Sequence, residues 1–181
     1  MTRYEIALIE FESATAEGEH EKLIYAYFGA AIYFAQCLEE SFSMMLWTNR
    51  IFKEQAKSSN EINEIIDAIE NSKKTMGSFL NEVKQNYELS ENHIAELESV
   101  LNRRNYLVHK YFKLEIQKFH SDKGKKEMLK YFADFIEDTV LIDDELQKYF
   151  LNYKIRLGFT EDKIAELLEK MKQKELQRDI E

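Results

Sequence analysis

The sequence contains no proline and only five glycines among its 181 residues. Proline interrupts helices more strongly than any other residue, because it removes a backbone donor and clashes with the preceding turn. Nothing in this chain blocks long helices, and four of the five glycines fall where the apolar periodicity breaks. This feature favours long helices joined by short turns.

Apolar residues recur in steps of three and four along most of the chain, the spacing of helices that bury one side. Between about residues 20 and 50 they are Ile24, Phe28, Ala31, Ala35, Leu38, Phe42 and Met45. A later segment repeats the spacing with Met128, Phe132, Phe135, Thr139, Ile142, Leu146, Tyr149 and Tyr153. The pattern predicts two long helices.

Shorter helices are expected between and after these two. One is predicted over 61–71, with Asn60 as its N-cap and Ile62, Ile65, Ile66 and Ile69 directed inward. Another carries Phe79, Leu80 and Val83, and a third begins after Ser90, which is expected to be its N-cap. A last helix, over about 160–178, is capped by Thr160 and directs Ile164, Leu167, Leu168 and Met171 inward. The polar stretch 114–124 is predicted to be a loop, and 3–11 to be a short extended segment or a helix start.

These elements predict an all-α fold, an antiparallel up-and-down helical bundle formed by residues 1–181 as a single domain. The length suits one hydrophobic core. No apolar run is long enough to cross a membrane, and acids occupy the N-terminal region where a signal peptide would be apolar. The single cysteine, Cys37, excludes an internal disulfide and suits a reducing compartment, so a cytoplasmic location is expected.

The net charge of −9 argues against a protein that coats nucleic acid through overall positive charge. Residues 103–126 are different, because eight Lys and Arg residues there face only two acids, a local charge of +6. Such a region can hold a phosphate-bearing ligand at one place on an otherwise negative protein. The alternative is a solvated, lysine-rich loop.

The most unusual segment is RRNYLVHKYF at 103–112. The helix that contains it has an apolar stripe of Leu97, Leu101, Arg104, Val108 and Tyr111, in which Arg104 is the one charged member. A guanidinium cannot lose its proton to suit an apolar core, so it needs an anion or a wet cleft. His109 lies five residues on, about 140° around the helix. The two side chains therefore mark the edges of one face, half of a cleft that a second copy of the chain would complete.

A histidine can exchange a proton near neutral pH, and an arginine can hold a phosphate and stabilise its growing charge. Together they suffice to cleave RNA without a metal. Alternatively, Arg104 pairs with an acid and His109 packs as a core residue. The acids available for such a pair include Glu39, Glu40, Asp143, Asp144 and Glu145.

The spacing Arg104-x4-His109-x-Tyr111, with Asn105 directly after the arginine, resembles the motif of the HEPN superfamily, in the form found in HEPN toxins. The resemblance implies a core over about 20–155 and a homodimeric, metal-independent endoribonuclease, a toxin or phage-defence effector. Arg104 would bind the phosphate, His109 would act as general base or acid, and Asn105 would orient the histidine or the RNA. It also implies that a partner nucleotidyltransferase, the antitoxin, modifies Tyr111 with AMP.

Arg103, Lys110 and Lys113 are expected to contact RNA phosphates beside this motif. No metal or other cofactor is expected, because His20, His93 and His120 are scattered and no Gly-rich phosphate loop occurs. The alternative function is a non-catalytic helical module for dimerisation or protein interaction.

Overall fold

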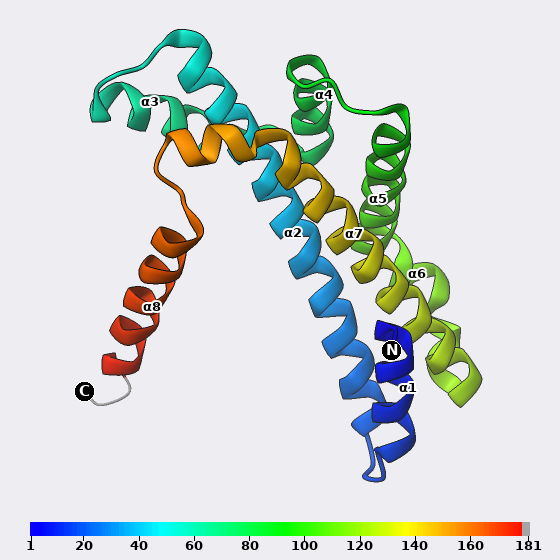
Figure 1. The fold of residues 1–181 in the computed structure, drawn as a ribbon. Helices are drawn as coiled ribbons and strands as arrows, with labels where there is room; N and C mark the ends of the chain where they lie inside the picture. Colours follow the sequence, from blue (N-terminus) through cyan, green and yellow to red (C-terminus); the bar gives the residue numbers. More distant parts are fainter. Residues whose placement is uncertain (179–181) are drawn as a thin grey trace.

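The computed structural model describes residues 1–178, which form helices and turns without a strand (Figure 1). The α-helices are α1 (Arg3–Ser13), α2 (Glu19–Glu54), α3 (Ser59–Glu70), α4 (Met76–Asn86), α5 (Glu91–His109), α6 (Tyr111–Glu115), α7 (Asp122–Arg156) and α8 (Glu161–Arg178). A 3₁₀ helix, η1 (Ile116–His120), connects α6 to α7. The all-α prediction is confirmed for this range, and the ambiguous segment 3–11 is helical.

The long helices α2 and α7 lie side by side at the centre of the molecule and supply most of its core. Near the start of α2, Phe28 packs edge-on against Phe132 of α7. Near its end, the ring of Phe52 lies against that of Tyr153. These two contacts show that α2 and α7 run in the same direction. The antiparallel prediction is wrong for this central pair.

Helix α5 packs on α7 in the opposite direction. Its first turn contacts α7 through His93, whose Nδ1 lies 2.8 Å from the hydroxyl oxygen of Tyr149. Two turns or more further on, the Arg103 side chain pairs with Asp138. Helix α1 is antiparallel to α2. The hydroxyl of Tyr27, near the start of α2, donates to Glu10 near the end of α1. The α2–α7 pair can be parallel because α5, which lies between the two helices in the chain, runs in the opposite direction to both.

Several helices begin with a side-chain cap. The hydroxyls of Ser58, Ser90 and Thr160 each accept a hydrogen bond from the backbone N–H three residues later. The caps predicted at Ser90 and Thr160 are confirmed. The cap predicted at Asn60 is wrong, since Ser58 forms a capping box with Glu61 and the helix begins two residues earlier.

The stretch 114–124, predicted to be a loop, is mostly helical. It contains the end of α6, the 3₁₀ helix η1 and the first turn of α7. Gly124 allows η1 and α7 to approach closely, because a Cβ at this position would lie 2.3 Å from the carbonyl oxygen of Lys118. These short helices were not predicted because the stretch is rich in polar residues. A short exposed helix buries too little apolar surface to produce a periodic pattern.

Helix α8 projects from the end of α7 and stands apart from the other helices (Figure 1). It has no buried residue among those described, and Leu168 and Met171 are 60% and 65% exposed. The prediction that its apolar stripe faces inward is therefore wrong for a single chain. No helix in the described range is long and apolar enough to cross a membrane.

Candidate functional site

The candidate site lies on the last two turns of α5. This helix buries Leu97, Val100 and Leu107, while Val108 is 42% exposed. The stripe predicted from the sequence is thus misplaced, because Val108 belongs to the open side of the helix. Asn105 and His109 are exposed on the same side. We call Arg104, Asn105, Val108 and His109 the α5 face.

Arg104 lies at the boundary between the buried side of α5 and the α5 face. One terminal nitrogen is 3.8 Å from a carboxylate oxygen of Glu39 on α2, and both side chains are 27% exposed. The other donates to Oδ1 of Asn105 at 3.1 Å. Glu39, one of the acids considered from the sequence, is thus the neighbour of Arg104. Its single long contact orients the guanidinium and leaves it open to a second anion.

His109 is the last residue of α5, and its ring is exposed. The helix ends here because Lys110 adopts a non-helical conformation (φ −135°, ψ −26°) before α6 begins. No proline or glycine marks this break in the sequence. His109 and Tyr111 therefore lie on different helices, and the spacing of the motif does not continue along one regular face.

Tyr111 is turned into the core and is 2% exposed. Its ring packs against Tyr131 and Phe132 of α7, and its hydroxyl has no hydrogen-bond partner among residues 1–178. Burial raises the pKa of this hydroxyl above its usual range. In this conformation the oxygen that would carry a modification is inaccessible to a partner enzyme.

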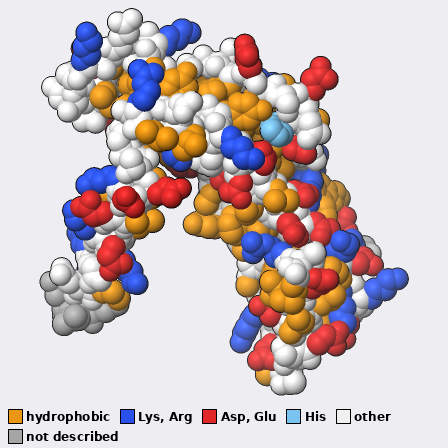
Figure 2. Space-filling view, viewed as in Figure 1, with side chains coloured by type: hydrophobic (Ala, Val, Ile, Leu, Met, Phe, Trp, Pro, Cys, Tyr) orange, Lys and Arg blue, Asp and Glu red, His pale blue; other side chains and the backbone are white. Residues whose placement is uncertain are grey.

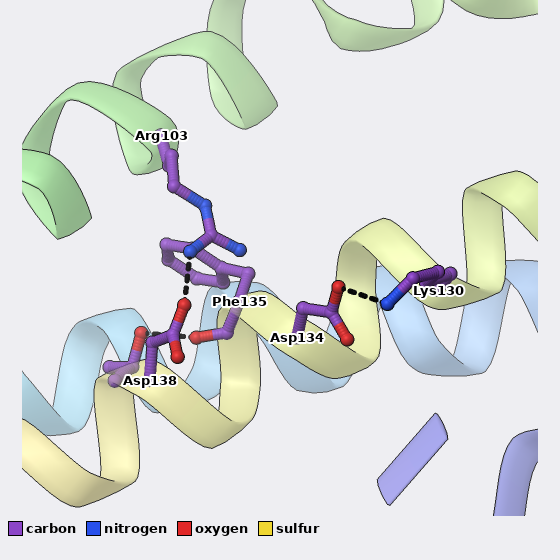
Figure 3. Close-up of polar contacts among 6 residues, drawn as sticks. Arg103, Lys130, Asp134, Phe135 and Asp138 are labelled. Carbon is purple, nitrogen blue, oxygen red and sulfur yellow. Dashed lines mark hydrogen bonds and ion pairs between the residues drawn. The ribbon is translucent and has the colours of Figure 1, made fainter. Parts of the chain in front are cut away.

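Arg103, predicted to contact RNA, is instead engaged within the protein (Figure 3). Its guanidinium pairs with Asp138 and lies over the rings of Phe135 and Tyr131, at 5.2 and 5.5 Å from their centroids. These contacts fasten α5 to α7. Figure 3 also shows the neighbouring pair Lys130–Asp134, which lies along the same side of α7.

The +6 region does not form one continuous basic surface. Five of its eight cations are paired with acids, namely Arg103, Arg104, Lys118, Lys125 and Lys126. Lys110 and Lys113 are exposed and form no ion pair within the described residues. They follow His109 directly in the chain. Of the predicted phosphate ligands, Lys110 and Lys113 are thus without an ion pair in the described structure, and Arg104 has only its long contact with Glu39.

A groove of about 500 Å³ between α5 and α7 was not foreseen from the sequence. His93, Arg103, Asp138 and Glu145 contribute to its lining. No pattern in the sequence indicates this groove, because its two walls are at least 35 positions apart in the chain and meet only through the way α5 crosses α7. Within residues 1–178, no group of three or more His, Cys, Asp or Glu side chains is arranged to hold a metal ion.

Comparison of the chain with protein-family models, with curated proteins and with solved structures finds no match. The α5 face must therefore be interpreted from its own chemistry.

Proposed function

We propose that this chain is a metal-independent endoribonuclease of the HEPN type that acts as a homodimer in the cytoplasm. The observation that carries the proposal is the α5 face itself. Arg104 is oriented by Glu39 and Asn105 without being neutralised in a tight pair, and His109 is exposed at the end of the same helix. A fixed cation and a titratable ring on one open face are the groups that phosphodiester cleavage requires.

In the proposed reaction one His109 ring removes the proton from a ribose 2′-OH, and this oxygen attacks the adjacent phosphorus. The bond from phosphorus to the 5′-oxygen of the next nucleotide breaks, and that oxygen takes a proton from a second acid, such as the His109 of a second copy. The products are a 2′,3′-cyclic phosphate and a 5′-hydroxyl. Arg104 binds the non-bridging oxygens, whose negative charge grows in the transition state.

Exposed apolar side chains near the α5 face support the homodimer. Tyr25 and Tyr33 on α2 are exposed, and Gly29 lies between them at helical spacing with open space where a Cβ would be. A small residue between two rings lets a second helix approach closely. Val108 on α5 and Leu114 on α6 are also exposed. Two copies joined through these surfaces would place two α5 faces along one groove.

We extend the proposal to a toxin or phage-defence role, controlled by a nucleotidyltransferase antitoxin that adds AMP to Tyr111. Because the Tyr111 hydroxyl is buried, this modification requires the five residues of α6 to open from α7. The mass of Tyr111 peptides from protein co-expressed with a candidate antitoxin tests this role separately from RNA cleavage.

The test of the proposed activity uses purified protein and single-stranded RNA in the presence of EDTA. The protein should cleave the RNA, and the His109→Ala variant should lose at least about 100-fold in rate while it keeps its oligomeric state. Because His109 is exposed, its replacement is expected to leave folding intact. Cleavage that persists in the His109→Ala protein would exclude the mechanism.

The second candidate is a non-catalytic interaction module in which Arg104 serves only to pair with Glu39. The contact between these two residues is the observation in its favour. This function predicts no RNA cleavage and a loss of stability when Arg104 is removed.

A further inference from the structure

Helix α8 combines an uncovered apolar stripe with an unequal distribution of charge. Its stripe consists of Ile164, Leu167, Leu168 and Met171, which share one side of the helix at steps of three and four. Figure 2 shows apolar side chains exposed on α8, at a distance from the apolar surface of the other helices. An amphipathic helix usually gains its stability by burying such a stripe against another element.

The linker before α8 is fixed in a way that directs the helix away from its own chain. The backbone N–H of Phe159 donates to the carbonyl of Lys154 at 2.9 Å, and that of Gly158 donates to Ile155 at 3.0 Å. The Phe159 ring also contacts Trp47 of α2. In this arrangement nothing within residues 1–178 covers the stripe, so an occupant from outside the chain is the candidate to cover it.

The charges of α8 identify that occupant. Residues 161–169 contain four acids and one lysine, a charge of −3, whereas residues 170–178 contain four basic residues and one acid, a charge of +3. Ion pairs within the helix use some of these groups, including Glu166 with Lys163 and Lys170. The groups that form no ion pair in the described structure are segregated in the same way: Glu161, Asp162 and Glu169 precede Lys172 and Lys174.

We propose that α8 pairs in an antiparallel orientation with α8 of a second copy of this chain. In this orientation the acidic half of each helix lies beside the basic half of the other, and the two apolar stripes meet at the centre. A parallel pair would place like charges together, which is unfavourable. The helix is thus complementary to itself. This inference does not depend on RNA cleavage.

Four apolar side chains per helix bury less than the roughly 800 Å² per partner of a stable interface. The α8 pair is therefore an additional contact between chains, and its occupancy depends on protein concentration or on a second interface that raises the local concentration.

Disulfide trapping tests the pairing and its direction. Because Cys37 is the only cysteine, a Cys37→Ser background allows one new cysteine to be placed at a time. Leu168→Cys lies near the centre of the stripe and should form a covalent dimer under mild oxidation. Ile164→Cys should not, because the two copies of residue 164 would be roughly 10–16 Å apart along an antiparallel pair. Glu169→Cys is the control, since it lies at the same level on the opposite side of the helix.

Equal trapping of Ile164→Cys and Leu168→Cys would indicate a parallel pair, and trapping of Leu168→Cys no better than the control would exclude pairing. Both results overturn the proposal. Since α8 contributes no buried residue, these variants should fold, and circular dichroism checks this.

Charge reversal tests the complementarity itself, with Leu168→Cys as the reporter. The double change Glu166→Lys and Glu169→Lys makes both halves of α8 positive, and Lys170→Glu with Lys172→Glu makes both halves negative. Each variant alone should lose most of its covalent dimer, and an equimolar mixture should recover it as a heterodimer. Trapping that is unaffected by either reversal would contradict the proposed basis of the pairing.

Discussion

Replacement of the adjacent residues Arg103 and Arg104 by alanine should affect different properties. Arg103→Ala should lower the stability of the fold, and Arg104→Ala should lower the rate of RNA cleavage. Arg103 pairs with Asp138 and lies over two aromatic rings, and its side chain is 24% exposed. An ion pair of this kind contributes up to about 1 kcal/mol, and each ring contact roughly 0.5–1 kcal/mol. Because these terms overlap, Arg103→Ala should lower the free energy of unfolding by about 1–2 kcal/mol.

Arg104→Ala should cost less than about 0.5 kcal/mol. Its contact with Glu39 is a single one at 3.8 Å between partly exposed groups, and pairs of this type contribute little. The Glu39 carboxylate keeps access to water after the change, so no buried charge is left without a partner. The loss in activity should be large, at least about 100-fold in the rate of RNA cleavage, because the arginine stabilises charge in the transition state.

Thermal unfolding followed by circular dichroism measures the stability of both variants. For a chain of this length, 1 kcal/mol shifts Tm by roughly 2–4 °C. Arg103→Ala should therefore lower Tm by about 2–8 °C, and Arg104→Ala by less than about 2 °C. If Arg104→Ala is the more destabilising change, Arg104 is a structural residue and the assignment of the α5 face is wrong.

Four further substitutions test other parts of the structure. Burial raises the pKa of Asp143, and one of its carboxylate oxygens has no hydrogen-bond partner in the part of the chain that the structure describes. A folded-state pKa above the unfolded value means that the charge destabilises the fold at neutral pH and that this cost disappears in acid. Asp143→Asn should thus raise the free energy of unfolding by on the order of 1 kcal/mol at pH 7 and have no effect below about pH 4. Urea titrations at the two pH values measure this difference. An equal gain in stability at both pH values would contradict the prediction. Gly124→Ala should lower Tm because the new Cβ meets the backbone at Lys118. Gly77→Ala is the control, because its Cβ would meet the Leu101 side chain at an ordinary distance of 3.5 Å, and it should not lower Tm; similar Tm values for the two variants would refute the close approach at Gly124. Tyr111→Phe removes a buried hydroxyl without a partner, so the free energy of unfolding should stay the same or rise, and a loss above about 1 kcal/mol would mean that this hydroxyl is hydrogen-bonded.

The sequence predicted the long helices well because each of them buries one continuous stripe. The buried residues of α2 and α7 include most members of the two stripes. The same spacing in α8 was misleading. Periodicity shows that a helix has an apolar side, but it does not show whether this chain or another molecule covers that side.

The candidate site was predictable as a set of residues but not as an arrangement. Arg103 and Arg104 are equivalent in a one-dimensional pattern, yet a rotation of about 100° directs one toward α7 and the other toward α2. Tyr111 turns inward because the helix breaks at Lys110, and the sequence has no proline or glycine at that break. Such features depend on contacts between helices that are distant in the sequence.

The chemistry of the cleaved RNA ends tests the central claim most directly. A synthetic RNA should be incubated with the protein in EDTA, and the new ends identified by mass spectrometry, alongside the same RNA with 2′-deoxyribose at the cleaved position. Attack by the 2′-oxygen predicts a 2′,3′-cyclic phosphate and a 5′-hydroxyl from the first RNA and no cleavage at the modified position of the second. A 5′-phosphate product, or cleavage beside the 2′-deoxyribose, would contradict the roles assigned to Arg104 and His109.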